Sequence, residues 1–364
     1  MLLQELTDFL ESLAPLPLQE DYDNAGLITG DPRQEISKAV IALDCTEAVI
    51  EEAIAEGAEV VIAHHPIVFR GLRKLTGRTY VERAVLRAIR DRIAIYAIHT
   101  NLDHILEGVN AKICEKLGLQ QTRILVPQTG MLRKLVTFSP HAQAEAVRSA
   151  LFEAGAGHIG NYDRCSYNLE GYGTFRGGAG SQPFVGEPGA THREPETRIE
   201  VVYPVYLEGR ILQALLQAHP YEEPAYDLYS LANAWPMAGA GMVGELPREV
   251  PLLDFLNEVK EKMKAGCIRY TKPLKAQVRR VAVCGGAGGS LLQDAIRAGA
   301  DLFITADYKY HEFFDAEDRI VIADIGHYES EQFTGELLRE KISKQFPNFA
   351  ALLTQVNTNP VNYL

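Results

Sequence analysis

Cysteines are few in this sequence, and long hydrophobic runs are absent. The 364 residues include five scattered cysteines and no Cys-x-x-Cys pair. Such a set argues against a disulfide framework and is typical of free thiols in a reducing compartment. No apolar run approaches the roughly 20 residues that a membrane-spanning helix needs. Residues 1–16 lack the basic region of a signal peptide and place leucines at helical spacing, which predicts an amphipathic helix. We therefore expect a cytoplasmic protein without a membrane partner.

Positive charge is also in deficit. The chain has 36 lysines and arginines against 48 aspartates and glutamates, which gives a net charge of −12. This balance disfavours a nucleic-acid partner, because neutralising phosphates requires clustered lysine and arginine. The stretch RGLRKLTGR, from Arg70 to Arg78, is a local exception. It either binds a small phosphorylated or nucleotide ligand or is a solvated loop.

The sequence contains an internal repeat. Ala53–Pro66 (AIAEGAEVVIAHHP) aligns without a gap to Ala295–Tyr308 (AIRAGADLFITADY), and both segments predict a helix end, a glycine turn and a buried strand. Each copy follows one strand and precedes a helix and another strand. The outer parts of the chain therefore predict two related β-α-β-α-β units, with parallel sheets covered by helices.

A different segment separates the two units, from roughly Pro127 to Trp235. A strand and a helix precede a glycine-rich polar stretch, and a strand, a helix and a strand follow it. The pattern β-α-β-β-α-β suggests a ferredoxin-like α+β domain. The predicted fold class is α/β, with core unit one at 1–126, the inserted domain at 127–235 and core unit two at 236–364. The two core units would form one discontinuous core.

Residues that bind metals gather at the ends of predicted strands. Ligands of parallel sheets bind outside the carboxyl ends of the strands, and histidine and carboxylate are the ligands of borderline and hard divalent metals. The candidate residues are His64, His65, His99, Asp103, Asp307, His327 and Glu331. Five or six such ligands suit two metals that share a bridging carboxylate or water better than one tetrahedral structural zinc.

Each candidate also has a purely structural explanation. A single histidine at a strand end is usually structural, Asp103 is placed to cap a following helix, and Glu331 is placed on a helix face that solvent would cover. Position favours the metal site, because four of the ten histidines end predicted core strands. A helix beginning at His327 would also put Glu331, four residues later, on the same face.

A glycine-rich turn within Val281–Ile296 (VAVCGGAGGSLLQDAI) has two interpretations. Such loops can bind phosphate through backbone N–H groups. This one fits neither the Walker pattern nor GxGxxG, so a tight turn is favoured, and the sequence predicts no cofactor-binding residue of that kind.

The motifs AHHPIVFRGL, HTNLD and GHYESE closely resemble those of the Nif-three-like dinuclear-metal proteins, which are named GTP cyclohydrolase I type 2 homologs. The resemblance covers essentially the whole chain, including DNAGLITG, CGGAGGS and HPYEEPAYDLYSL. It implies two divalent ions, of zinc, iron or manganese, with Glu331 as a bridging ligand beside His64, His65, Asp103 and His327. It also implies a toroidal homohexamer and an insert of the PII-like or CutA-like fold.

Two functions of different classes follow from this resemblance. In the first, the protein is a metal-dependent hydrolase similar to a GTP cyclohydrolase, in which His99 orients water or transfers a proton and Asp307 binds the substrate. In the second, it is a non-catalytic metal-binding regulator or metallochaperone assembled as a toroid. A ligand-rich site without an obvious dedicated base suits the second function.

Overall fold

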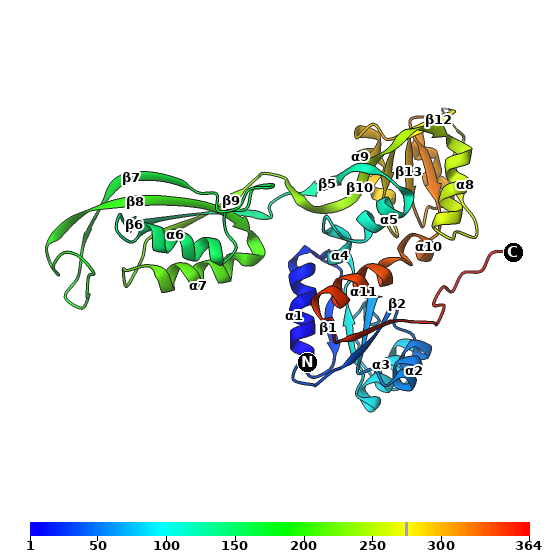
Figure 1. The fold of residues 1–364 in the computed structure, drawn as a ribbon, viewed down its shortest axis with the longest axis horizontal. Coiled ribbons are helices and arrows are strands. Elements are labelled where there is room, and N and C mark those ends of the chain that lie inside the picture. The colour runs from blue at the N-terminus through cyan, green and yellow to red at the C-terminus, as the bar shows by residue number, and fades with distance from the viewer. Residues whose placement is uncertain (274–275) are drawn as a thin grey trace. The chain divides into compact units, whose positions relative to one another are not determined.

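The computed structural model describes residues 1–273 and 276–364. They form two compact units, one made of Met1–Pro127 with Pro236–Leu364 and the other of Gln128–Trp235 (Figure 1). We call them the core unit and the insert unit. The fold is mixed α/β, and the described residues form three sheets. None of the helices within the described ranges is long and apolar enough to cross a membrane.

The first sheet of the core unit has five strands in the order β1-β4-β3-β2-β15. Strands β2, β3, β4 and β15 are parallel, whereas β1 pairs antiparallel with β4 at the edge, which the repeat did not predict. The bounds are Gly26–Thr29 (β1), Lys38–Asp44 (β2), Val60–His65 (β3), Ala94–Ala97 (β4) and Ala350–Leu353 (β15). Strand β15 comes from the far end of the chain, so the last residues complete the first sheet.

Local signals in the sequence account for the helices beside this sheet. The Thr46 side chain accepts a hydrogen bond from the Val49 N–H and so caps α2, which ends at Gly57 with φ 66°. Helices α2 and α3 share a buried core with β2, β3 and β4. The predicted N-terminal amphipathic helix is α1, which buries Leu3, Leu6 and Leu10. The bounds are Leu3–Leu13 (α1), Glu47–Glu56 (α2), Tyr80–Asp91 (α3), Thr100–His104 (α4) and Val109–Leu117 (α5).

The second sheet of the core unit has six strands in the order β11-β14-β13-β12-β10-β5. Its central strands β12, β13 and β14 are parallel and correspond to β2, β3 and β4 in the repeat, while β10 and β11 are antiparallel. The strand bounds are Gln120–Gln128 (β5), Trp235–Pro251 (β10), Arg269–Tyr270 (β11), Gln277–Val283 (β12), Leu302–Thr305 (β13) and Val321–Asp324 (β14).

The helices in the second half of the core unit are Leu252–Lys262 (α8), Leu292–Arg297 (α9), His327–Glu331 (α10) and Thr334–Gln345 (α11). Short 3-10 segments lie at Leu16–Leu18, Gly289–Leu291 and Tyr310–Ala316. The single helix that the sequence predicts after His327 is divided, because α10 ends at Glu331 and α11 begins at Thr334. Asp103 lies inside α4 and does not cap α5, which begins at Val109.

The insert unit is a four-stranded antiparallel sheet in the order β7-β8-β6-β9, with helices α6 and α7 packed on it. Part of the glycine-rich stretch that the sequence presents as a polar connection is strand, because β7 and β8 extend into it and pair. The bounds are Leu132–Pro140 (β6), Ala144–Glu153 (α6), Tyr167–Arg176 (β7), Thr191–Pro204 (β8), Glu208–Ala218 (α7) and Tyr226–Leu231 (β9), with a 3-10 segment at Val205–Leu207.

Candidate metal centre

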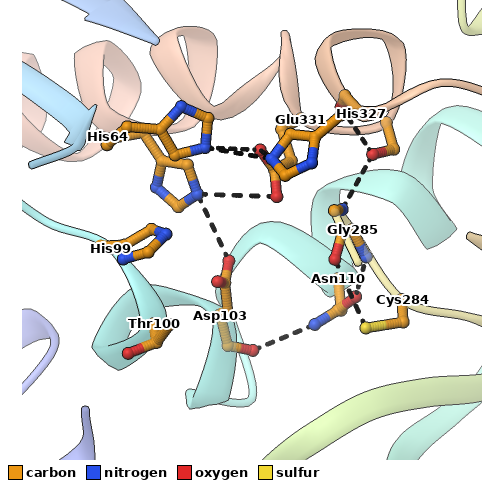
Figure 2. A network of polar contacts seen from close by, with 12 residues as sticks. His64, His99, Thr100, Asp103, Asn110, Cys284, Gly285, His327 and Glu331 are labelled. Carbon is orange, nitrogen blue, oxygen red and sulfur yellow. Dashed lines mark hydrogen bonds and ion pairs between the residues drawn. The ribbon is translucent and has the colours of Figure 1, made fainter. Parts of the chain in front are cut away.

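The two sheets of the core unit bring five of the predicted residues together (Figure 2). His64 and His65 end β3 and come from the first sheet, and Asp103 lies in the short helix α4 that follows β4. His327 and Glu331 begin and end α10, one turn apart, after β14 of the second sheet. In both sheets the candidate ligands follow the carboxyl ends of parallel strands, and these ends face each other.

Glu331 lies at the middle of the cluster and is almost fully buried. Its Oε2 atom lies 2.9 Å from His65 Nε2 and 3.1 Å from His327 Nε2. Its Oε1 atom lies 4.0 Å from His64 Nε2. One carboxylate therefore faces imidazoles from both sheets, with one oxygen toward each side of the cluster.

His64 and Asp103 face each other without a hydrogen bond. His64 Nε2 lies 3.6 Å from Asp103 Oδ1, and both atoms are buried and have no hydrogen-bond partner among the described residues. A buried polar atom without a partner costs free energy, so native structures nearly always satisfy such atoms. Together with Glu331, these residues form a group of donors that could hold a metal ion.

Each imidazole is held from behind by an acceptor at its other nitrogen. His64 Nδ1 lies 2.7 Å from the Ile98 carbonyl oxygen, and His65 Nδ1 lies 2.8 Å from Asp44 Oδ1. His327 Nδ1 lies 2.7 Å from Asp307 Oδ2. An acceptor at Nδ1 fixes the tautomer that carries its proton there, so Nε2 is left free to bind a metal.

His99, which the sequence predicts as a catalytic residue, also has an acceptor at Nδ1. Its Nδ1 atom lies 2.7 Å from Asp23 Oδ1. The Asp23 carboxylate also accepts hydrogen bonds from the backbone and side chain of Thr100. The His99 ring centroid lies 5.3 Å from that of His64 and 5.4 Å from that of His65. His99 therefore adjoins the cluster, and hydrogen bonds fix its orientation.

Burial and charge shift the pKa values of the cluster in opposite directions. Burial opposes protonation of His64 and lowers its pKa to about 3. Burial raises the pKa of Asp103 well above its usual value, and the negative charge of Glu331 raises it further. For Glu331 itself, burial is outweighed by hydrogen bonds from His327 and His65, which hold its pKa well below the usual range.

Neighbouring carboxylates raise the pKa values of His65 and His327. Burial lowers the pKa of both, but hydrogen bonds to Asp44 and Glu331 raise that of His65 to about 9. Hydrogen bonds to Asp307 and Glu331 raise the pKa of His327 to about 11. A metal ligand must be deprotonated, so a bound metal would have to displace the proton that each raised pKa favours. Metal affinity at this cluster should therefore fall as the pH is lowered.

The family model Duf34/NIF3 (NGG1p interacting factor 3) matches residues 1–360. The chain belongs to the Duf34/NIF3 family. It is 38% identical to a Halalkalibacterium halodurans protein named GTP cyclohydrolase 1 type 2 homolog, over 99% of this chain and 98% of that protein. A Bacillus subtilis protein of the same name is 35% identical, over 99% of this chain and 98% of that protein.

Solved structures agree with this Duf34/NIF3 membership. A crystal structure of a Bacillus cereus protein related to NIF3 has 37% identity and a TM-score of 0.87, over 100% of this chain and 99% of that chain. A Staphylococcus aureus protein has 29% identity and a TM-score of 0.80, over 100% of this chain and 99% of that chain.

In this Duf34/NIF3 chain, three residues around the cluster have supporting roles that the sequence did not predict. Asp44 ends β2 and supports His65, as Asp307 after β13 supports His327. Because the counterpart of β13 in the repeat is β3 and not β2, the repeat could not indicate Asp44. Asp23 precedes β1 in the DNAGLITG motif, where no periodicity marks a role. Gly286 has φ 62°, and a Cβ there would lie under 3.0 Å from Glu331 Oε1. The glycine-rich turn is therefore tight because it packs against Glu331.

Proposed function

We propose that the chain binds two divalent metal ions through His64, His65, Asp103, His327 and Glu331, and that it uses them to hydrolyse a small polar substrate. The observation that carries the proposal is the unsatisfied pair His64 Nε2 and Asp103 Oδ1, both buried and facing each other. A site that served only to stabilise the fold would hydrogen-bond these atoms. A cation between them would satisfy both.

The donor set fits two ions better than one. The donor atoms divide into His64, Asp103 and Glu331 on one side and His65, His327 and Glu331 on the other, with the atoms of each set within 4.8 Å of one another. Glu331 belongs to both sets, one oxygen to each, so we assign it as the bridging ligand. Three imidazoles and two carboxylates suit zinc, iron or manganese.

The chain's own residues supply positioning and proton transfer. Two bound divalent ions would supply Lewis acidity and lower the pKa of a nearby water. Asp23 orients His99, so that the imidazole Nε2 is free to hold a proton or pass it to the substrate. Asp307 accepts a hydrogen bond from His327, and we therefore assign it to positioning that ligand rather than to binding substrate. The names of the curated relatives support GTP as the first substrate to test.

The test is metal content per chain together with GTP turnover before and after chelation. We expect two metals per chain, chelator-sensitive turnover, and loss of at least one metal in Glu331→Gln. Glu258→Gln, on the surface of α8, is the matched control and should keep both metals. Less than about one metal per chain, or equal metal content in Glu331→Gln and the wild type, would overturn the metal site. Two metals without any GTP turnover would overturn GTP hydrolysis and favour the regulator or metallochaperone.

We further propose that the insert unit has the ferredoxin-like arrangement. Its element order is β-α-β-β-α-β, and its sheet order places the first and third of its strands in the centre. Both features are those of that arrangement.

We also propose that the protein assembles as a homohexamer, which the family resemblance supports. Sedimentation at about six times the 40.3 kDa chain mass is the expected result. A monomer or dimer at the same concentration would contradict it.

A further inference from the structure

The insert unit contains a pocket of its own, which shares no residue with the metal centre. The pocket has a volume of about 530 Å³ and opens beside the glycine-rich ends of β7 and β8. Five of its sixteen lining residues are aromatic, and three of its four charged residues are glutamates. The lining residues include Gly173, Phe175, Phe184, Glu196 and Tyr221.

Glu196 is the unusual residue in this pocket. It lies on β8 and is only 7% exposed. Its Oε1 atom accepts a hydrogen bond of 2.8 Å from the Tyr221 hydroxyl. Among the described residues, no other hydrogen bond to this carboxylate is formed, although a carboxylate has about four acceptor positions. A charge that is largely removed from water normally has a fuller set of partners.

Gly173 keeps the second oxygen of Glu196 open. Gly173 lies on β7, opposite β8, and a Cβ at this position would lie under 3.0 Å from Glu196 Oε2. Any larger residue would therefore displace the carboxylate or fill the space in front of it. Two residues earlier on the same strand, Gly171 has no atom within 4 Å of such a Cβ. In the register Gly171 is the direct partner of Glu196 and Gly173 pairs with Glu194, so the close approach belongs to the diagonal position, toward which the carboxylate extends.

Two further aromatic rings lie near Tyr221, the hydrogen-bond partner of the carboxylate. The Tyr221 ring centroid lies 6.0 Å from that of Phe175 and 6.4 Å from that of Phe184. The Glu222 carboxylate accepts a hydrogen bond from the Gln182 backbone N–H at 3.1 Å, which ties the loop carrying Phe184 to the chain beyond Tyr221. Aromatic faces carry partial negative charge and attract cations, and a neighbouring carboxylate adds to that attraction.

We propose that this pocket binds a small organic cation, a protonated amine or guanidine with an apolar body. The cationic group would donate a hydrogen bond to Glu196 Oε2, and the apolar body would pack on Phe175, Phe184 and Tyr221. The volume lies within the range of ordinary small-molecule sites. Glu222 and Glu223 also line the pocket, against Arg176 as its one cation, so its charge suits a cation rather than a phosphate. This site is separate from the proposed hydrolase and does not depend on it.

The test uses calorimetric titration of the full-length, metal-loaded protein with phenethylammonium and with its neutral counterpart, phenethyl alcohol. We expect the ammonium to bind at least about tenfold more tightly than the alcohol, because one charge-assisted hydrogen bond distinguishes them. Gly173→Ala and Glu196→Gln should each weaken ammonium binding by about tenfold or more. Gly171→Ala is the matched control and should bind as the wild type does.

Thermal unfolding and metal content of each variant will show whether the fold is retained. Three outcomes would overturn the proposal: no ammonium binding up to about 10 mM, equal binding of amine and alcohol, or unchanged binding by both Gly173→Ala and Glu196→Gln. None of these outcomes bears on the metal centre, whose donors lie in the core unit.

Discussion

At the scale of single residues, the proposed metal centre depends on hydrogen-bond acceptors that bind the histidine Nδ1 atoms and are not themselves candidate ligands. Asp44, Asp307 and the Ile98 carbonyl each hold one imidazole at Nδ1, so all three histidines present Nε2. A charged acceptor also makes the imidazole a stronger base and hence a stronger ligand. The orientation of the His65 and His327 imidazoles therefore depends on two aspartates, Asp44 and Asp307, that are not candidate metal ligands.

Asp44→Asn should weaken metal binding by about 10- to 100-fold, because it removes the negative charge behind His65 while keeping the side-chain shape. Competition with a chelator of known affinity measures the change. Asp31→Asn provides the control, since Asp31 pairs with Arg33 at the surface and lies away from the cluster. Equal affinity in the two variants would show that Asp44 does not tune the ligand.

The sequence predicts which ligand-type residues meet, but not how they are supported. His64, His65, His327 and Glu331 follow apolar runs that read as strands, and parallel strands in related sheets bring such ends together. Asp23 lies in a connection before β1, where no repeating pattern exists, and only the folded chain shows its bond to His99. Support of this kind links residues far apart in the chain, which spacing does not reveal.

At the scale of elements, the turn after β12 packs against the Glu331 carboxylate. The Gly286 N–H donates to Ser330 Oγ at 2.9 Å, and the Gly285 N–H donates to Asn110 Oδ1 at 2.9 Å. Asn110 in turn donates to the Asp103 carbonyl oxygen at 3.1 Å (Figure 2). The turn, α5 and α10 are therefore joined by hydrogen bonds around the cluster.

Gly286→Ala should reduce metal content, because its Cβ would collide with Glu331 Oε1 and its φ of 62° disfavours alanine. We expect at least one metal to be lost, together with a stability loss of about 1 kcal/mol from the backbone alone. Elemental analysis and thermal unfolding measure the two effects. Gly289→Ala is the matched control, since the nearest atom to its Cβ lies at 3.8 Å. Full metal occupancy in Gly286→Ala would mean that the turn can shift without moving Glu331.

The sequence predicted this element only as a tight turn. Glycine clusters indicate sharp turns whatever lies opposite them, so the pattern could not reveal the close approach to Glu331. The sequence also does not predict that the helix after His327 is divided into α10 and α11. The stretch from Tyr328 to Ile342 contains no glycine pair or proline that would mark the break at Gln332 and Phe333.

At the scale of the whole molecule, the proposed metal centre lies between the two sheets of the core unit and takes side chains from both. The repeat predicted both sheets and the correspondence of their central strands. It could not predict that β15 returns to the first sheet, because Ala350–Leu353 is a short apolar segment outside either copy. Ligands from both sheets mean that bound metal should stabilise the core unit as a whole.

Removing metal should therefore lower the unfolding temperature of the core unit. A ligand at about 100 times its dissociation constant stabilises the folded state by about 2.7 kcal/mol, which corresponds to a shift of several degrees. Calorimetry with and without chelator measures the shift. His64→Ala should unfold at a lower temperature and respond less to added metal, because it lacks a ligand from one set. An unchanged transition in the wild type on chelation would contradict the role of metal as a link between the sheets.

Because β15 lies near the end of the chain, the first sheet is completed only late in synthesis. The insert unit is continuous in the chain and can fold once its own residues leave the ribosome, since folding units form in the order of synthesis. The first sheet lacks β15, and the metal centre lacks His327 and Glu331, until almost the whole polypeptide has been made. If the proposed centre binds metal, the complete set of donors becomes available only after synthesis, because a nascent chain displays only the histidines and the aspartate of its first half.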